Sequence, residues 1–154
     1  MVDVIREFTV PRSPEEVVAY LSDFSNAVAW DPGTVRCERV GSGPVQVGST
    51  WKNTSKVLGR ETELDYVLTT LKPDHVVLTG TNKTATSTDD MTIKSDPAGT
   101  KITYHANIVF NGIAKLAEPL MQRVFEKLGD ETVEGITREL APGRSGAAQP
   151  AGES

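Results

Sequence analysis

The chain has 154 residues, a mass of 16.6 kDa and a single cysteine, so it is long enough to bury one core and cannot form an internal disulfide. Its formal net charge of -5 and the lack of any Lys/Arg cluster argue against nucleic-acid binding, because phosphate recognition needs a concentrated basic patch. No apolar run approaches the roughly 20 residues of a membrane helix, and the N-terminal sequence lacks the regions of a secretory signal. We therefore expect a soluble, cytoplasmic protein without an integral membrane segment.

The first elements in chain order are a strand and two short helices. Alternating apolar residues over Val2–Val10 predict the strand. Ser13 and Glu16 then form a capping box that starts a helix, and a second capping signal at Ser22-Asp23 predicts a break into two helices. Pro32-Gly33 ends them with a turn. The apolar residues at helical spacing in this region are Val17, Leu21, Phe24 and Val28.

Six further strands are predicted from a period of two between turn signals. Short connections favour antiparallel pairing, because parallel strands need long crossovers. The predicted strands span residues 34–40, 49–58, 60–71, 75–80, 84–94 and 100–110.

A single long helix closes the predicted order. Apolar residues recur at helical spacing over residues 115–140, namely Leu120, Met121, Val124, Leu128 and Ile136. This helix must bury its apolar stripe against one face of the sheet, and a helix of about 10–12 Å diameter cannot fill the hollow of a seven-stranded sheet. We therefore predict one domain over residues 1–140 with an internal cavity, followed by a disordered tail over residues 141–154.

The element order and several segments resemble the helix-grip superfamily, also called SRPBCC or START-like, which includes START lipid-transfer domains, pollen-allergen-like proteins and the bacterial polyketide cyclase/dehydrase group. The resemblance covers about residues 2–140. It implies an α+β helix-grip fold, with a curved seven-stranded antiparallel sheet around the long C-terminal helix and two short helices after the first strand. It also implies a cavity for hydrophobic ligands. The matching segments are residues 10–33, 41–51, 99–112 and 116–140.

Strand parity predicts which side chains face this cavity, because adjacent residues of a strand point to opposite faces. Asp89 and Asn53 are the inward polar candidates, although we favour a solvated position for Asp89 near the end of its strand. By the resemblance, Trp30 either walls the ligand space or wedges the short helices against the sheet. The remaining residues of the predicted lining are Trp51, Tyr66, Met91, Tyr104, Leu120, Val124 and Leu128.

The sequence gives little support for phosphate binding, metal binding or a reactive cysteine. The Gly-rich stretch at residues 41–44 leads into a strand rather than a helix, so it is not a phosphate loop. His75 and His105 have no partner at metal-ligand spacing, and Cys37 is predicted to be a small buried hydrophobe. We predict no metal and no cofactor.

The sequence predicts binding of a small hydrophobic or amphipathic ligand, lipid-, isoprenoid- or polyketide-like. The alternative is a polyketide cyclase/dehydrase-type enzyme, with Asp89, Tyr104 or Tyr66 orienting and protonating a carbonyl, although no complete catalytic constellation can be identified. A protein-interaction module is a third possibility, and it would show an exposed apolar patch. No feature of the sequence specifies a protein partner.

Overall fold

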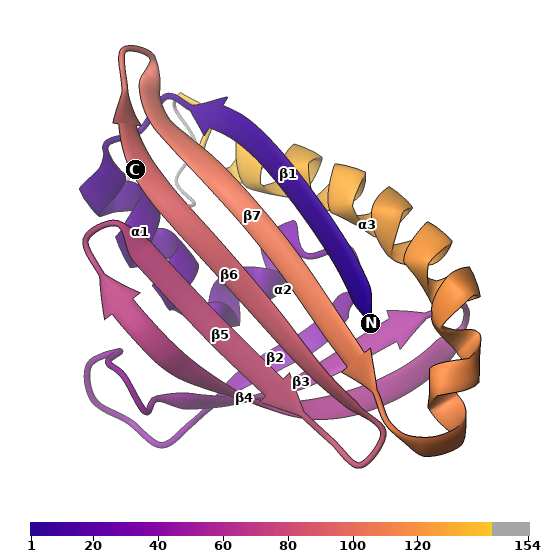
Figure 1. The fold of residues 1–154 in the computed structure, drawn as a ribbon. Coiled ribbons are helices and arrows are strands. Elements are labelled where there is room, and N and C mark those ends of the chain that lie inside the picture. Colours follow the sequence, from indigo (N-terminus) through magenta and orange to yellow (C-terminus); the bar gives the residue numbers. More distant parts are fainter. Residues whose placement is uncertain (143–154) are drawn as a thin grey trace.

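Seven strands form one antiparallel sheet in the computed structural model, which describes residues 1–142. The predicted tail therefore lies, from residue 143 onward, outside the described residues. The sheet order is β1-β7-β6-β5-β4-β3-β2, so each strand pairs with its neighbour in the chain except β1, which pairs with β7 (Figure 1). The strands are β1 (Val2–Val10), β2 (Thr34–Val40), β3 (Thr50–Val57), β4 (Arg60–Lys72), β5 (His75–Thr81), β6 (Ala85–Asp96) and β7 (Gly99–Phe110).

The two predicted short helices lie between β1 and β2, and the break between them is capped. They are α1 (Pro14–Ser22) and α2 (Ala27–Trp30), with the 3₁₀ turn η1 (Phe24–Asn26) between them. Ser13 Oγ accepts a hydrogen bond of 3.2 Å from the backbone N–H of Glu16, and the Glu16 carboxylate accepts one of 3.2 Å from the N–H of Ser13. Asp23 Oδ1 accepts from the N–H of Ser25 at 3.1 Å, which starts η1.

The C-terminal helix begins later than predicted. The 3₁₀ turn η2 (Gly112–Ala117) precedes α3 (Glu118–Glu139), so the helix starts at residue 118 rather than 115. Pro119 lies in the first turn of α3, where the missing N–H of proline costs no helical hydrogen bond. At the other end, Arg12 donates to the carbonyl oxygens of Leu140 and Ala141 at 3.3 and 3.0 Å, so the chain stays attached to the domain one residue beyond the predicted boundary.

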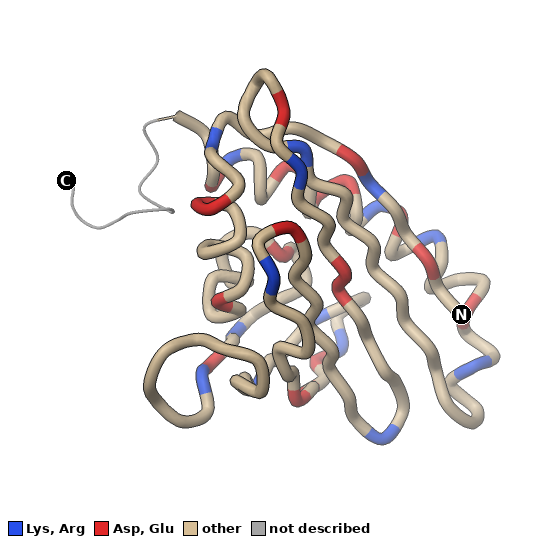
Figure 2. Tube along the Cα trace, turned by 60° about the vertical axis from the view of Figure 1, so that its left-hand side comes forward, with Lys and Arg blue, Asp and Glu red and all other residues tan. Residues whose placement is uncertain are grey.

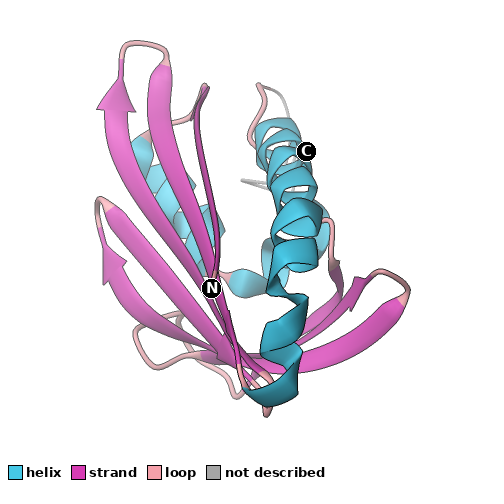
Figure 3. Cartoon of the chain, turned by 45° about the vertical axis from the view of Figure 1, so that its right-hand side comes forward, coloured by secondary structure: helices cyan, strands magenta, loops and turns pink. Residues whose placement is uncertain are grey.

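The helix α3 crosses the concave face of the sheet, which bends beneath it (Figure 3). Its closest packing is with β1 and α2. Arg6 of β1 donates to Asp130 at 2.8 Å and to Glu126 at 3.0 Å, and Gly129 leaves room for Val4, since a Cβ atom at Gly129 would lie 2.6 Å from the Val4 side chain. Within α3, the buried residues all belong to its C-terminal half: Gly129, Thr132, Gly135 and Ile136.

The core fills the space between the short helices, the sheet and this half of α3. Phe24 is its centre, with ring centroids 6.0 Å from Trp30, 6.3 Å from Trp51 and 4.5 Å from Tyr66. The N-terminal half of α3 has no such layer beneath it. These observations confirm the predicted helix-grip fold and show that only one end of the hollow between sheet and helix is packed.

Candidate functional site

A cavity of about 540 Å³ lies under the N-terminal half of α3, between the helix and the concave face of the sheet. Its volume falls in the range of about 300–1,000 Å³ that is typical of pockets for small molecules. Most of its walls are apolar. The apolar side chains come from β1, β3, β4, β7 and α3, and include Val4, Val57, Leu64, Ile108, Phe110, Met121, Phe125 and Leu128.

The mouth of the cavity is formed by the β3–β4 and β5–β6 connections and by η2, which gather at one end of the sheet (Figure 1). Leu58 and Leu120 line the cavity there and are 68% and 58% exposed. Ile113 and Leu116 of η2 are 86% and 80% exposed. A hydrophobic ligand would therefore meet apolar side chains before it reaches the interior.

The inner end of the cavity is polar. Asp31, Tyr66, Asp89 and Tyr104 all line the cavity. Tyr104 lies six residues before Phe110 on β7, which places it about 20 Å deeper than the mouth at 3.3 Å per residue. The ring of Tyr66 lies over β5, where Gly80 is its partner in register and a Cβ atom at that glycine would lie 2.5 Å from the ring.

Asp89 is a buried carboxyl group with few hydrogen bonds to replace its lost hydration. It is 5% exposed, and the Tyr104 hydroxyl donates to its Oδ1 at 3.3 Å, the one hydrogen bond of this carboxyl within residues 1–142. Burial and, to a smaller extent, the negative charge of Asp31 raise the pKa of Asp89 to about 7, while the Tyr104 hydrogen bond opposes the rise. The solvated position that we favoured from the sequence for Asp89 is wrong.

Asp31 is a second carboxyl group of the inner end. Its Oδ1 accepts from the backbone N–H of Gly33 at 3.1 Å and its Oδ2 from the Thr34 hydroxyl at 2.9 Å. Burial raises the pKa of Asp31, while these two hydrogen bonds oppose the rise. Two carboxyl groups that share one poorly solvated site disfavour each other's charged form.

The two tyrosines are held in their neutral form. Burial raises the pKa of both Tyr66 and Tyr104 well above 10, and the nearby Asp89 raises it further. Their hydroxyl groups are therefore hydrogen-bond donors and acceptors at any ordinary pH.

Half of the sequence-predicted residues line the cavity and half do not. Tyr66, Asp89, Tyr104, Leu120 and Leu128 line it. Trp30, Trp51 and Met91 are fully buried in the core instead. Trp51 Nε1 donates to Ser25 Oγ at 3.1 Å, which turns the indole toward η1. Trp30 packs edge-on against Phe24 and Tyr104, the wedge arrangement of the two that the sequence left open.

Asn53 and Val124 also lie outside the lining. Asn53 donates to the Thr34 hydroxyl at 3.0 Å and accepts from the Ser55 hydroxyl at 2.7 Å. It therefore contacts the ligand site only indirectly, through Thr34, whose hydroxyl donates to Asp31. Val124 is one position away from Phe125, and residues one apart on a helix differ by about 100° in direction. The lining face of α3 includes Met121, Phe125, Leu128 and Thr132.

Asp31 and Phe125 also line the cavity, although the lining predicted from the sequence did not include them. The Asp-Pro-Gly-Thr sequence indicates an Asx-type turn, since Asp side chains bond the backbone two residues on. Nothing in that local pattern says that the turn faces the cavity. Phe125 was detectable, because it lies four residues after Met121 on the same helix face.

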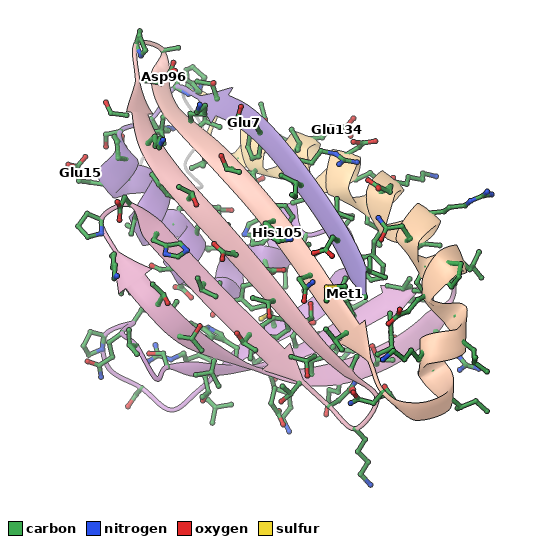
Figure 4. All side chains as sticks on the ribbon, in the orientation of Figure 1. Met1, Glu7, Glu15, Asp96, His105 and Glu134 are labelled. Carbon is green, nitrogen blue, oxygen red and sulfur yellow. The ribbon has the colours of Figure 1, made fainter. Side chains whose placement is uncertain are left out.

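Other candidate chemistries gain no site in the described part of the chain. No group of three or more His, Cys, Asp or Glu side chains within residues 1–142 is placed to hold a metal ion. His105 lies on the outer face of the sheet with its Nε2 2.8 Å from Asp3 (Figure 4). Lys and Arg are interspersed with Asp and Glu along the trace of residues 1–142 (Figure 2). None of the helices in that range is long and apolar enough to span a membrane.

Solved structures share this fold at low sequence identity. The aromatase/cyclase ZhuI from Streptomyces sp. R1128 has a TM-score of 0.75 at 14% identity, over 90% of this chain and 92% of that one. The protein TTHA0849 from Thermus thermophilus has a TM-score of 0.75 at 11% identity, over 90% and 96%. A START superfamily protein from Mycobacterium smegmatis has a TM-score of 0.73 at 10% identity, over 90% and 96%.

The family assignment comes from the sequence itself. Among curated proteins, none is similar enough to match this chain. The family model described as polyketide cyclase / dehydrase and lipid transport matches residues 1–141, nearly the whole of the part that the structure describes. The chain therefore belongs to the polyketide cyclase/dehydrase and lipid transport family.

Proposed function

We propose that the protein binds a small hydrophobic or amphipathic molecule, lipid-, isoprenoid- or polyketide-like, in the cavity under α3. The observation that carries this proposal is the cavity of about 540 Å³ with apolar walls and a polar inner end. An apolar pocket with few polar groups suits a ligand that is held by burial and oriented by hydrogen bonds. Family membership supports the same proposal, because the family's description includes lipid transport.

The exposed apolar side chains at the mouth support uptake of such a ligand. Monomeric proteins rarely keep large apolar side chains together on their surface without a use for them. Leu58, Ile113, Leu116 and Leu120 belong to segments that surround the opening. They give a hydrophobic molecule a favourable path into the interior, which a polar rim would not.

A cyclase or dehydrase activity is the second candidate, and Asp89 is the observation that favours it. Its pKa of about 7 keeps a large fraction of this acid protonated near neutral pH. A protonated carboxyl at the inner end could donate a proton to a carbonyl oxygen of a bound polyketide-like molecule. One of the structural neighbours is an aromatase/cyclase. That name describes the neighbour and not this chain.

Binding is tested with a neutral fluorescent probe, N-phenyl-1-naphthylamine, and a variant that fills the cavity. Ala106 lines the cavity from the middle of β7. Ala106→Phe should remove probe binding because the new ring occupies the ligand's space. Thr103→Phe is the matched control, since residue 103 points to the opposite face of the same strand and should leave binding intact. Equal probe binding by both variants would contradict the proposed site.

The natural ligand and the enzyme candidate need separate measurements. Native mass spectrometry of protein purified from its own host should show a retained small molecule that Ala106→Phe loses. A turnover assay on polyketide-like substrates tests the second candidate. Activity that Asp89→Asn abolishes while probe binding stays unchanged would favour the enzyme over the carrier.

A further inference from the structure

We infer that the inner end of the cavity selects amphiphiles whose polar end donates hydrogen bonds, such as alcohols and protonated amines, and rejects carboxylates. This inference rests on the proposed function, because it assumes that the cavity holds a ligand. It adds the chemical class of the ligand's polar end, and it assigns Asp31 and Asp89 as the residues that determine specificity.

The inner end offers unused acceptors. A carboxyl oxygen can accept about two hydrogen bonds, and only one of the two oxygens of Asp89 accepts any from residues 1–142. Each oxygen of Asp31 accepts one. Asp89 is more than nine-tenths buried, and both residues line the cavity. A hydroxyl or ammonium group placed there would satisfy acceptors that the protein itself leaves open.

No cationic side chain forms an ion pair with these acids within the described part of the chain. Its ionisable lining residues are Asp31, Arg60, Tyr66, Asp89 and Tyr104. Arg60 is exposed and opens β4 six residues before Tyr66, and within residues 1–142 it forms no ion pair with Asp31 or Asp89. A carboxylate that reached the inner end would meet two acids and two tyrosines, with nothing to balance its charge in a poorly solvated space.

The preference for an amine over an alcohol must depend on pH, and the raised pKa of Asp89 determines the direction of this dependence. Above a pH of about 7 Asp89 is ionised and attracts an ammonium group. Below that pH Asp89 gains a proton, and the attraction from its charge is lost while hydrogen bonding to an alcohol remains. The preference for an amine over an alcohol should therefore weaken as the pH falls from 8 to 5.5.

Three ligands with the same ten-carbon chain test the selectivity: decylamine, decanol and decanoate. Each displaces N-phenyl-1-naphthylamine at pH 8, where the amine is protonated and the acid is ionised. We expect the wild-type protein to bind decylamine at least tenfold more tightly than decanoate, with decanol between them. Asp89→Asn should reduce this ratio at least fivefold.

Asp90→Asn is the matched control. Asp90 is the next residue of β6, so it faces the outer side, where its Oδ1 lies 2.7 Å from His75 Nε2. It removes the same charge from the protein, and it should leave the amine-to-carboxylate ratio unchanged. If Asp89→Asn does not fold, the wild-type pH series replaces it, because decylamine and decanol do not change charge between pH 5.5 and 8.

Two results would overturn the inference. The first is decanoate binding as tightly as decylamine. The second is an amine-to-carboxylate ratio that Asp89→Asn leaves unchanged together with an amine-to-alcohol ratio that the lower pH leaves unchanged. Anchoring of the carboxylate by Arg60 at the mouth would produce the first. Failure of the proposed function looks different. In that case decanol and the uncharged probe would not bind at all, whereas failure of the inference alone leaves both bound.

Discussion

Gly135 of α3 lies directly against the backbone of Trp30 in α2, and a Cβ atom at position 135 would collide with the Trp30 carbonyl oxygen. This contact holds the C-terminal half of α3 at a fixed, close distance from the short helices. The N-terminal half, which carries Leu120, Met121 and Phe125, stands over the cavity instead. The glycine at one end of the helix thus allows close packing there, while the other end of the helix covers a cavity.

Gly135→Ala should lower the free energy of unfolding by about 1–3 kcal/mol, the usual cost of overpacking. Alanine is favoured over glycine inside a helix by about 1 kcal/mol, so a net loss would show that the contact with Trp30 dominates. The measurement is denaturant unfolding. Thr137→Ala, at an exposed position of the same helix, is the control and should leave stability unchanged or slightly raised. A stabilised Gly135→Ala would show that α2 and α3 are not pressed together.

Ile136 and Leu128 should respond differently to truncation, although both belong to the apolar stripe of α3. Ile136 is fully buried in the core, so Ile136→Ala should cost about 2–5 kcal/mol. Leu128 lines the cavity and is only partly buried. Leu128→Ala should cost less and change the affinity for the fluorescent probe, measured by titration. Equal stability losses with unchanged affinity would place Leu128 in the core.

Asp89 should make the protein less stable as the pH rises. Its pKa is 3.8 in the unfolded chain and about 7 in the folded one, so the folded state binds the proton more tightly. The stabilisation is complete below about pH 4 and is lost as the pH rises through 7. The difference in pKa corresponds to at most about 4 kcal/mol.

The measurement is the melting temperature of the wild type and of Asp89→Asn between pH 4.5 and 8. The variant should gain stability relative to the wild type as the pH rises, because asparagine carries no charge to bury. Asp90→Asn, on the outer face of the sheet, should show no such trend. A constant difference between wild type and Asp89→Asn across this range would mean that Asp89 does not titrate there.

Trp51 should affect stability rather than ligand affinity. The indole is fully buried, donates to Ser25 and packs against Phe24. Trp51→Phe removes the hydrogen bond, worth about 0.5–1.5 kcal/mol, and leaves a gap in the core. Unfolding and probe titration on the same variant separate the two effects. A loss of affinity with unchanged stability would return Trp51 to the ligand site that we predicted from the sequence.

The apolar mouth should control how fast a ligand enters. Leu58→Ser together with Leu120→Ser should slow transfer of the probe from lipid vesicles, because both side chains line the cavity at its opening and the ligand loses its apolar path there. Both residues are strongly exposed, so the melting temperature should not change. Val40→Ser, at an exposed position of β2 that pairs with Thr50 at the end of β3 opposite the β3–β4 connection, is the control. Stopped-flow fluorescence measures the transfer rate, and equal rates for both variants would exclude this role.

The local pattern determined the order of the elements and most strand faces. Alternation along β6 and β7 placed Asp89 and Tyr104 on the concave face, because a strand sends adjacent side chains to opposite sides. The capping box at Ser13 and Glu16 marked the start of α1 correctly, since both partners lie within one helical turn. These features depend on neighbours in sequence, which is why the sequence alone determined them.

Only the tertiary structure decided which inward residues meet the cavity and which meet the core. Trp30 and Met91 are fully buried in the core, whereas Tyr104 and Asp89 line the cavity, because Gly135 brings α3 against Trp30 and α1 packs on β6. Asp31 lines the cavity because the turn that carries it faces inward, and a turn has no repeating pattern of apolar residues from which its orientation could be predicted. The raised pKa of Asp89 likewise depends on burial and on the charge of Asp31, 58 residues away in the chain. Such properties arise from contacts between distant segments, and a one-dimensional pattern contains no measure of them.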